Sequence, residues 1–438
     1  MIARKNSLPP VILLDGGCNA LSAARSLGRA GIKVYALNAP NAHVRYSRYC
    51  TLLRPPGGER EVSARCEYLL SPDFRSFHGA VLLACSDAEI EFITQNREQL
   101  AQNYRLDLSE PTAQLAMLNK LDTYEKAVAA GVPVPRFWVP KTREQFEALR
   151  GDLEFPVVVK PLYSHVYRKQ FASNLVVAWD FEEAFKAFEV ARAAGIEVML
   201  VEMIPGPDDR LCSYYTYLDA DGSPLFHFTK RVIRRSPPVF GVGCHHVTDW
   251  NPEVRDVALR FFQAVGLRGL ANAEFKYDER DGRLKLIECN ARFTAANCLV
   301  MDSGIDLPLL VYNRIVGRPQ SLPTTYRTGL HLWYPLEDFH AFRCLRRQGS
   351  LTLCGWLASL VHRHRLPYFR WSDPLPSLVV ELRRLKQAMK SRLHRLGRAL
   401  LHRGQRPPQI SAPPGIRAQT VNRIEDKNIA VASTRGAI

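Results

Sequence analysis

The chain has 438 residues, of which 46% are hydrophobic and 23% charged, a balance typical of soluble globular proteins. This length exceeds one ordinary core, so we expect two or three lobes. The sequence has no apolar run of the roughly 20 residues that span a bilayer, and its N-terminal apolar run is too short for a signal peptide, which predicts a cytoplasmic protein.

The net charge of +16 is concentrated at one end of the chain. Residues 331–438 contain 19 Lys and Arg against 6 Asp and Glu, so 13 of the excess positive charges lie there. The basicity therefore describes the C-terminal quarter rather than the main body. The ten cysteines form no CxxC motif and no metal-spaced cluster with histidine, so we interpret them as reduced core thiols.

Residues 1–111 are predicted to form a small doubly wound α/β lobe. The segment PPVILLDGGCNALSAARSLGRAGIKVYALN (9–38) predicts a strand, a Gly-bearing turn, a helix and a strand, and GAVLLACSD (79–87) predicts a further strand. GGCNAL is not a dinucleotide fingerprint, which favours a structural turn or a site for part of a substrate. The strand ends direct polar side chains to the rim where open α/β sheets bind ligands. These are Asp15, Asn19, Ser86 and Asp87.

Residues 112–318 follow a different pattern, which predicts an α+β core. A helix over 112–131 precedes the strand FPVVVKP (155–161), a polar loop, and the strand EVMLVEMIPG (197–206). Two hairpins follow, LCSYYTYLDADGSPLFHFTKRVI and ANAEFKYDERDGRLKLIECNA, each turning at Asp-Gly.

The end of the second hairpin carries the clearest chemical signal. Alternate side chains of a strand share a face, so Glu288, Asn290 and Arg292 are expected to project together. Glu274, on the partner strand, should lie within about one residue of the position opposite Glu288. Two carboxylates and an amide oxygen suit Mg²⁺ shared with substrate phosphates, and Arg292 could neutralise a transferring phosphoryl group. The alternative is a solvated hairpin rim with a surface Glu–Arg pair.

Groups for a nucleotide lie upstream. Lys160 ends the buried strand FPVVVKP, where an unpaired ammonium is costly and a phosphate is a natural partner. Lys120 is expected inside a helix, and a surface lysine is the favoured alternative for it. The junction after residue 201 offers Glu202, the backbone of Met203 and Ile204, and then Asp208 and Asp209.

As an ordered set, these motifs resemble the ATP-grasp superfamily. The set runs from about 112 to 318: a helix with Lys120, then GVPVP, FPVVVKP, VEMIPG, EF and ECNAR. Any one motif is weak alone, and the lobe before them resembles the family's N-terminal domain. The resemblance implies two α+β subdomains that hold ATP between them, with a hinge near 202–206 and a flexible loop over the phosphates.

The resemblance also implies cofactors, a reaction and roles. It predicts ATP and Mg²⁺ (or Mn²⁺), and a ligase that activates a small-molecule carboxylate as an acyl phosphate and joins it to an amine or similar nucleophile. The implied roles are Lys120 and Lys160 for phosphate, Glu202 and Ile204 for adenine, Asp209 or less favourably Asp208 for ribose, Glu274, Glu288 and Asn290 for the metal, and Arg292 for the γ-phosphate.

Two loops depart from the family pattern. The segment LYSHVYRKQFAS (162–173) has no glycine, so either a phosphate-covering loop or a plain solvated turn fits it. The segment KRVIRRSPPVFGVGCHHV (230–247) supplies Lys230 and Arg234 as candidates for an anionic substrate or the acyl phosphate. His245 and His246 are interpreted as structural or substrate-facing rather than as metal ligands.

The C-terminal part is predicted as a helical, basic region (319–403) and a disordered tail (404–438). A helix over about 377–402 carries apolar residues at helical spacing, and residues 382–424 contain no Asp or Glu. This helix could contact an anionic membrane from the cytoplasmic side, or pack on its own protein with a solvated face. Nucleic acid is not expected as a partner, because no RNA-binding motif is present. A homodimer is the default expectation.

A second reading of the whole chain is a protein that keeps the ATP-grasp fold for binding or scaffolding without turnover. One form of this reading associates it with a membrane surface through its basic C-terminal helix. The glycine-free loop at 162–173 is its main support. The intact set of Lys160, Glu274, Glu288, Asn290 and Arg292 argues against it, because relaxed constraint should erode metal ligands first.

Overall fold

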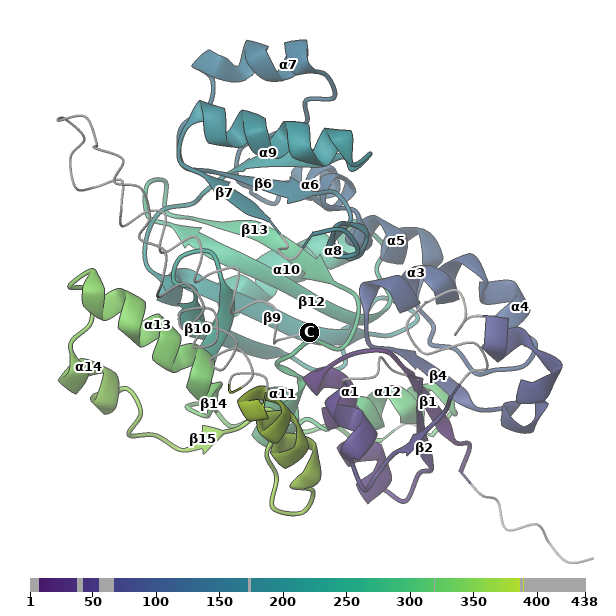
Figure 1. Ribbon diagram of the computed structural model, residues 1–438. Helices are drawn as coiled ribbons and strands as arrows, with labels where there is room; N and C mark the ends of the chain where they lie inside the picture. The colour runs from purple at the N-terminus through teal and green to yellow at the C-terminus, as the bar shows by residue number, and fades with distance from the viewer. Residues whose placement is uncertain are drawn as a thin grey trace, which may run out of the picture.

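The computed structural model describes residues 8–37, 42–54, 67–171, 175–318, 320–386 and 389. The predicted mixture of α/β and α+β parts is confirmed, because three sheets, each with its own helices, make up the described chain (Figure 1). The predicted disordered tail and the end of the predicted C-terminal helix lie outside the described residues.

The N-terminal lobe is built on a parallel sheet with the strand order β3-β2-β1-β4. All four residues of β1 are buried, as expected for a parallel strand with helices on both faces. The elements are β1 (Val11–Leu14), α1 (Cys18–Arg29), β2 (Val34–Leu37), η1 (His43–Tyr46), β3 (Thr51–Leu52), η2 (Pro72–Phe77), β4 (Val81–Ala84), α3 (Asp87–Gln95) and α4 (Arg97–Ala101).

The predicted helix over 112–131 is two helices, α5 (Pro111–Leu118) and α6 (Lys120–Ala129). Asn119 between them is extended, and its side chain accepts hydrogen bonds from the amides of Leu121 and Asp122, which caps α6. Lys120 is therefore the first residue of a helix rather than an interior one. Its amide donates to the Leu162 carbonyl (3.1 Å), which places the lysine beside the end of β6.

A small antiparallel sheet with the order β5-β8-β6-β7 forms the next layer. Helices α7 and α9 cover one of its faces, where Phe146 packs against Phe181 and Phe188. The segment predicted as a loop after β6 contains a five-residue helix, α8. The elements are β5 (Phe137–Trp138), α7 (Arg143–Glu147), η3 (Ala148–Gly151), β6 (Val157–Pro161), α8 (Ser164–Arg168), β7 (Val176–Ala178), α9 (Phe181–Ala193) and β8 (Val198–Glu202).

The largest sheet has seven strands in the order β13-β12-β9-β10-β11-β14-β15. Helix α10 packs on one face through Val254, Phe261 and Phe262, and this face forms a large apolar core. The elements are η4 (Asp208–Arg210), β9 (Leu211–Leu218), β10 (Phe228–Ser236), β11 (Val242–Asp249), α10 (Pro252–Ala264), β12 (Gly269–Asp278), β13 (Arg283–Asn290), α11 (Asn297–Ser303) and α12 (Leu307–Ile315).

The C-terminal region was expected to be helical, yet it also contributes two strands to one edge of the seven-stranded sheet. They are β14 (His331–Trp333) and β15 (His364–Arg365), and they flank α13 (Pro335–Arg347) and α14 (Leu353–Ala358). Residues 375–386 and 389 are helical, and this unlabelled helix lies at the bottom of Figure 1. Among the described residues, no helix is both long enough and apolar enough to cross a bilayer.

A buried ion pair fastens the C-terminal region to the N-terminal lobe. Arg25 Nε on α1 donates to Asp373 Oδ2 at 2.9 Å, and the two side chains are only 6% and 2% exposed. Asp373 also accepts from Ser47 Oγ (2.7 Å) and the Arg48 amide (2.9 Å). The satisfied network holds together segments more than 320 residues apart in the chain.

Asp373→Asn should destabilise the protein, because it leaves the buried Arg25 without a counter-charge. Breaking a buried pair in this way typically costs about 3–5 kcal/mol of unfolding free energy. Urea unfolding of the full chain, followed by circular dichroism, measures the loss. Asp256→Asn, which removes a pair on the exposed face of α10, is the control and should leave the midpoint unchanged. Equal midpoints for the two variants would contradict the role of Asp373.

Candidate functional site

A row of polar side chains crosses the face of the large sheet that α10 does not cover. The strand register pairs Glu288 on β13 with Glu274 on β12, Glu274 with Ser213 on β9, and Ser213 with Lys230 on β10. Residues paired directly across strands share a face. These four residues, called the carboxylate row below, include both carboxylates predicted for the metal, and the predicted opposition of Glu274 and Glu288 is confirmed.

A β-bulge makes this arrangement compatible with the core. On β13, Leu284 and Leu286 belong to the apolar core beneath the sheet, and simple alternation would send Glu288 there as well. The register shifts between the pairs Glu274–Glu288 and Phe275–Leu286, so that Ile287 is the extra residue. The extra residue reverses the alternation and brings Glu288 to the opposite face from the two leucines.

The two carboxylates suit a divalent cation. Burial raises the pKa of Glu274, and the neighbouring charge of Glu288 raises it further. Within the described part of the chain, the Glu274 carboxylate accepts no hydrogen bond. Asn290 faces Asn272 across the same two strands, and the side-chain oxygen of Asn272 is buried without a partner. Carboxylate and amide oxygens are hard ligands of the kind that Mg²⁺ prefers.

Two lysines lie close to the carboxylates. Lys120 Nζ is 3.9 Å from Glu288 Oε1 and 2.6 Å from Ser164 Oγ on α8. Burial lowers the pKa of Lys160 to about 8, and the positive charge of Lys120 contributes to the shift. Two neighbouring ammonium groups form a site that attracts phosphate oxygens.

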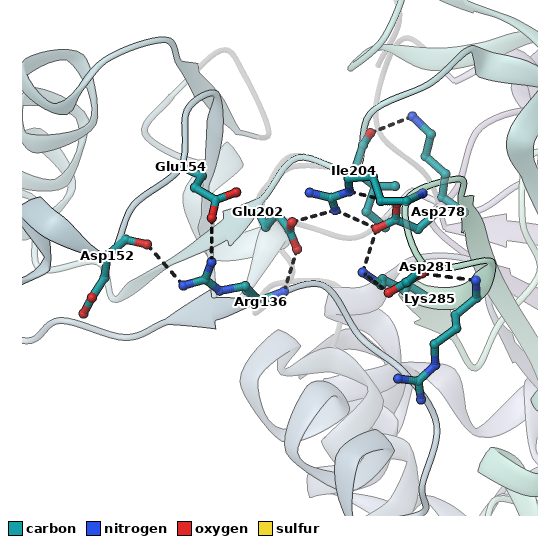
Figure 2. A network of polar contacts seen from close by, with 11 residues as sticks. Arg136, Asp152, Glu154, Glu202, Ile204, Asp278, Asp281 and Lys285 are labelled. Atoms are coloured by element: carbon teal, nitrogen blue, oxygen red, sulfur yellow. Dashed lines mark hydrogen bonds and ion pairs between the residues drawn. The ribbon is translucent and has the colours of Figure 1, made fainter.

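The hinge after β8 is held by a network of polar contacts (Figure 2). Glu202 accepts from the Arg136 amide (3.1 Å) and pairs with Arg280 (2.6 Å), so its carboxylate is occupied. Lys276 Nζ donates to the Ile204 carbonyl at 2.8 Å. Among the described residues, the amides of Met203 and Ile204 donate to no acceptor. The main chain at 203–204, more than the side chain of Glu202, is therefore available to a flat base.

The two aspartates after the hinge differ in their contacts. Asp208 accepts from the amide and Nε of Arg235, both at 2.9 Å, and from the amide of Val239 at 3.1 Å. Asp209 is exposed. The geometry thus favours Asp209 over Asp208 for a ligand's hydroxyl groups.

Lys230 and Arg234, predicted as a pair of substrate contacts, lie on opposite faces of the sheet. Lys230 is buried in the carboxylate row, with Nζ 3.0 Å from Ser213 Oγ. The register shifts on both sides of Arg234, and its guanidinium pairs with Asp338 on α13 at 2.7 Å and donates to His245 Nδ1 at 2.8 Å. These shifts bring Arg235 to the site face instead, where its charge influences Lys160 and Glu274.

Three histidines cluster beyond Arg234, on β11, β14 and β15. The ring nitrogens of His245, His331 and His364 lie within 4.8 Å of one another. However, Arg234 can only donate, so His245 Nδ1 must accept and its Nε2 carries the proton toward His331 (2.8 Å). A protonated Nε2 beside a guanidinium does not bind a metal, which agrees with the structural role expected for His245. His246 lies on the other face, 3.5 Å from Lys230.

Arg292 lies just beyond the residues predicted to bind the metal and pairs with Asp87 at the start of α3. Burial alone would lower the pKa of Arg292, but the carboxylates of Asp87 and then Glu288 raise it above its ordinary value. Asp87 is one of the four rim residues expected from the strand ends. Its direct contact with Arg292 was not expected, because no local sequence signal links residues 205 positions apart.

Comparisons with known proteins find relatives in sequence and in fold. No protein-family profile matches the chain. A D-aspartate ligase of Enterococcus faecium is 25% identical over 346 residues, which cover 72% of this chain and 79% of the relative. Among solved structures, a biotin carboxylase–ATP complex from Campylobacter jejuni matches 73% of this chain and 74% of its own with a TM-score of 0.57 and 17% identity. An L-amino acid ligase from Bacillus licheniformis matches 74% and 78% with a TM-score of 0.53 and 18% identity.

The low pKa of Lys160 predicts a pH dependence of nucleotide binding. The free protein carries the ammonium below about pH 8 and loses it above, so its affinity for MgADP should fall about tenfold between pH 7 and pH 9. Lys160→Arg keeps its charge over this range and should bind with a flat profile. Calorimetric titration at each pH provides the measurement. A flat wild-type profile would show that Lys160 does not contact the phosphates.

Proposed function

We propose that this chain, which belongs to the ATP-grasp superfamily and is an ATP-dependent carboxylate–amine ligase, activates the carboxylate of an amino acid. ATP and Mg²⁺ are its cofactors. The observation that carries the proposal is the opposed pair Glu274 and Glu288, which lies beside Lys120 and Lys160 at the junction of two sheets.

The nucleotide roles follow from the contacts of each residue. The main chain at Ile204, positioned by Lys276 and by the Glu202 network, would hold the adenine, and Asp209 would meet the ribose. Lys120 and Lys160 would hold the phosphates. Glu274, Glu288 and Asn290 would hold Mg²⁺, which when bound neutralises charge on the phosphate oxygens.

The reaction would take place at the end of the site away from the adenine. A substrate carboxylate attacks the γ-phosphorus, and the bond to the β-phosphate oxygen breaks to give an acyl phosphate and ADP. An amine then attacks the acyl carbon, phosphate leaves, and the amine gives up a proton. Arg292 and Lys230 lie near the two carboxylates and would stabilise the charge that develops on the oxygens of the transferring phosphoryl group. Arg235 would take the substrate-binding role that was predicted for Arg234.

The substrate class is inferred from the relatives. The D-aspartate ligase and the L-amino acid ligase that this chain resembles are both named for amino acids. The reading as a scaffold without turnover is not favoured, because the metal ligands and phosphate lysines are all present and close together.

The test is ligation of an amino acid. With MgATP, hydroxylamine and single D- or L-amino acids, one or more should release ADP and form an acyl hydroxamate. Glu274→Gln should reduce the rate by about 100-fold or more, since it removes a metal ligand. Glu279→Gln, exposed on the same hairpin, is the matched control and should be unaffected. If hydroxamate forms only from carboxylates that lack an amino group, the proposed substrate class is wrong.

We also propose that the C-terminal helix contacts an anionic membrane surface. Its described part exposes Leu375, Leu378, Leu382, Leu385 and Met389, which recur every three or four residues along one stripe. Trp371, 90% exposed, lies one turn upstream, and basic residues flank the stripe. An apolar stripe with a basic border is suited to the interface of anionic lipid.

Vesicle co-sedimentation tests this contact in the full chain. The wild type should bind phosphatidylglycerol vesicles, and this binding should fall with added salt. The double variant Leu378→Glu, Leu385→Glu should not bind these vesicles. Neither protein should bind vesicles of phosphatidylcholine. The variant Val166→Glu, on an exposed apolar position far from the stripe, is the control. If light scattering instead shows a dimer that the double variant dissociates, the stripe is a homodimer interface and the membrane proposal fails.

A further inference from the structure

Helix α8 docks on the N-terminal lobe at two points. Arg168 Nη2 lies 3.5 Å from Asp87 Oδ2, and His165 Nε2 lies 3.0 Å from Glu91 Oε2. The partners are three residues apart on α8 and four apart on α3, so each pair uses one face of its helix. The first residue of α8, Ser164, contacts Lys120 at 2.6 Å. The helix therefore bridges the phosphate lysines and the N-terminal lobe, where the family pattern predicts a flexible loop.

The carboxylate of Asp87 is shared. Its Oδ2 atom is 3.3 Å from Nη2 of Arg292, and its Oδ1 atom accepts from Nε of the same guanidinium. One side chain of the N-terminal lobe thus contacts both α8 and the arginine beside the metal ligands. Burial alone would raise the pKa of Asp87, but Arg292 and then Arg168 and Lys120 lower it below its ordinary value. The group is therefore a fixed negative charge.

This charge has a task that Glu288 and Glu274 cannot perform. Both carboxylates attract Arg292, and a guanidinium drawn onto them would compete with a cation for the same oxygens. Asp87, on the N-terminal lobe, accepts two hydrogen bonds from the guanidinium. Among the described residues, Arg292 forms no ion pair with Glu274 or Glu288, so its positive charge stays in the site without occupying their oxygens.

The main chain around both residues is clamped. Asn19 Nδ2 donates to the Cys85 carbonyl at 2.7 Å and to the Phe293 carbonyl at 2.9 Å. These carbonyls lie two residues before Asp87 and one residue after Arg292. The side-chain amide of Asn19 therefore fixes the distance between the two segments that carry the Asp87–Arg292 ion pair. This contact explains why the turn in GGCN is followed at once by a buried asparagine.

We infer that Asp87 is a positioning residue, which holds Arg292 in line with the transferring phosphate and, through Arg168, holds α8 closed over the nucleotide. The inference rests on the proposed function, because it assigns α8 and Arg292 to a phosphoryl-transfer site. Closure of the lid and alignment of the arginine then depend on one carboxylate, so a nucleotide that closes α8 also orders the catalytic end of the site.

The kinetic test separates the two contacts of Asp87. Arg168→Gln breaks only the lid contact and should raise KM for ATP several-fold with kcat nearly unchanged. Asp87→Asn should raise KM equally and also lower kcat about 100-fold, as expected for a misplaced catalytic group. The double variant should match Asp87→Asn, because both substitutions remove the same lid contact. Asp87→Glu, which keeps the charge, should recover part of kcat, and Asp73→Asn, exposed in the same lobe, is the control.

Limited trypsin digestion follows the lid without turnover. MgADP should protect the bonds after Arg168 and Lys169 in the wild type, and the protection should be lost in Asp87→Asn and Glu91→Gln. If the wild type binds no MgADP, the proposed function itself fails. If it binds and is protected, while Asp87→Asn shows wild-type kcat and equal protection, only the positioning role is overturned. Should Asp87→Asn not fold, Glu91→Gln and Asp87→Glu decide the same question.

Discussion

Repulsion between two carboxylates is the constraint on which the rest of the site depends. Glu274 and Glu288 occupy directly opposed positions on adjacent strands, and burial makes the charge of Glu274 more costly. Such a pair is stable only where positive charge is supplied. Lys120 on α6, Lys160 on the small sheet and Lys230 on the large sheet lie around the pair. Among the described residues, the shortest ion pair between these lysines and the two carboxylates is 3.9 Å long, from Lys120 to Glu288. The charges of these residues therefore suit a cation and phosphate groups bound together.

Charge also explains why three lobes act as one unit. Arg25 on the N-terminal lobe is buried against Asp373 of the C-terminal region, and Arg292 of the core is held by Asp87 of the N-terminal lobe. A buried ion needs its partner, so each lobe is stabilised by a group that belongs to another. The N-terminal lobe therefore contributes a residue to the candidate site through its ion pair with Arg292.

Much of the site was predictable because local patterns control it. The turn at Asp-Gly sets the register of the second hairpin, so the opposition of Glu274 and Glu288 follows from counting residues back from the turn, to within the one residue of the bulge. The position of Lys160 at the end of a buried, valine-rich strand was equally predictable from the sequence. The assignments that changed involve β10, where register shifts around Arg234 turn it toward α13 and bring Arg235 to the site.

The sequence alone determined the kinds of group available, their order along the chain, and the strands and turns that place the candidate metal ligands. Only the tertiary structure decided which groups meet: the pairing of Asp87 with Arg292, the docking of α8 on α3, and the extension of the large sheet by β14 and β15. The physical reason is that period and turn chemistry act over a few residues. Bulges, and ion pairs between lobes, are selected by packing and by the cost of burying charge, which depend on parts of the chain that are remote in sequence.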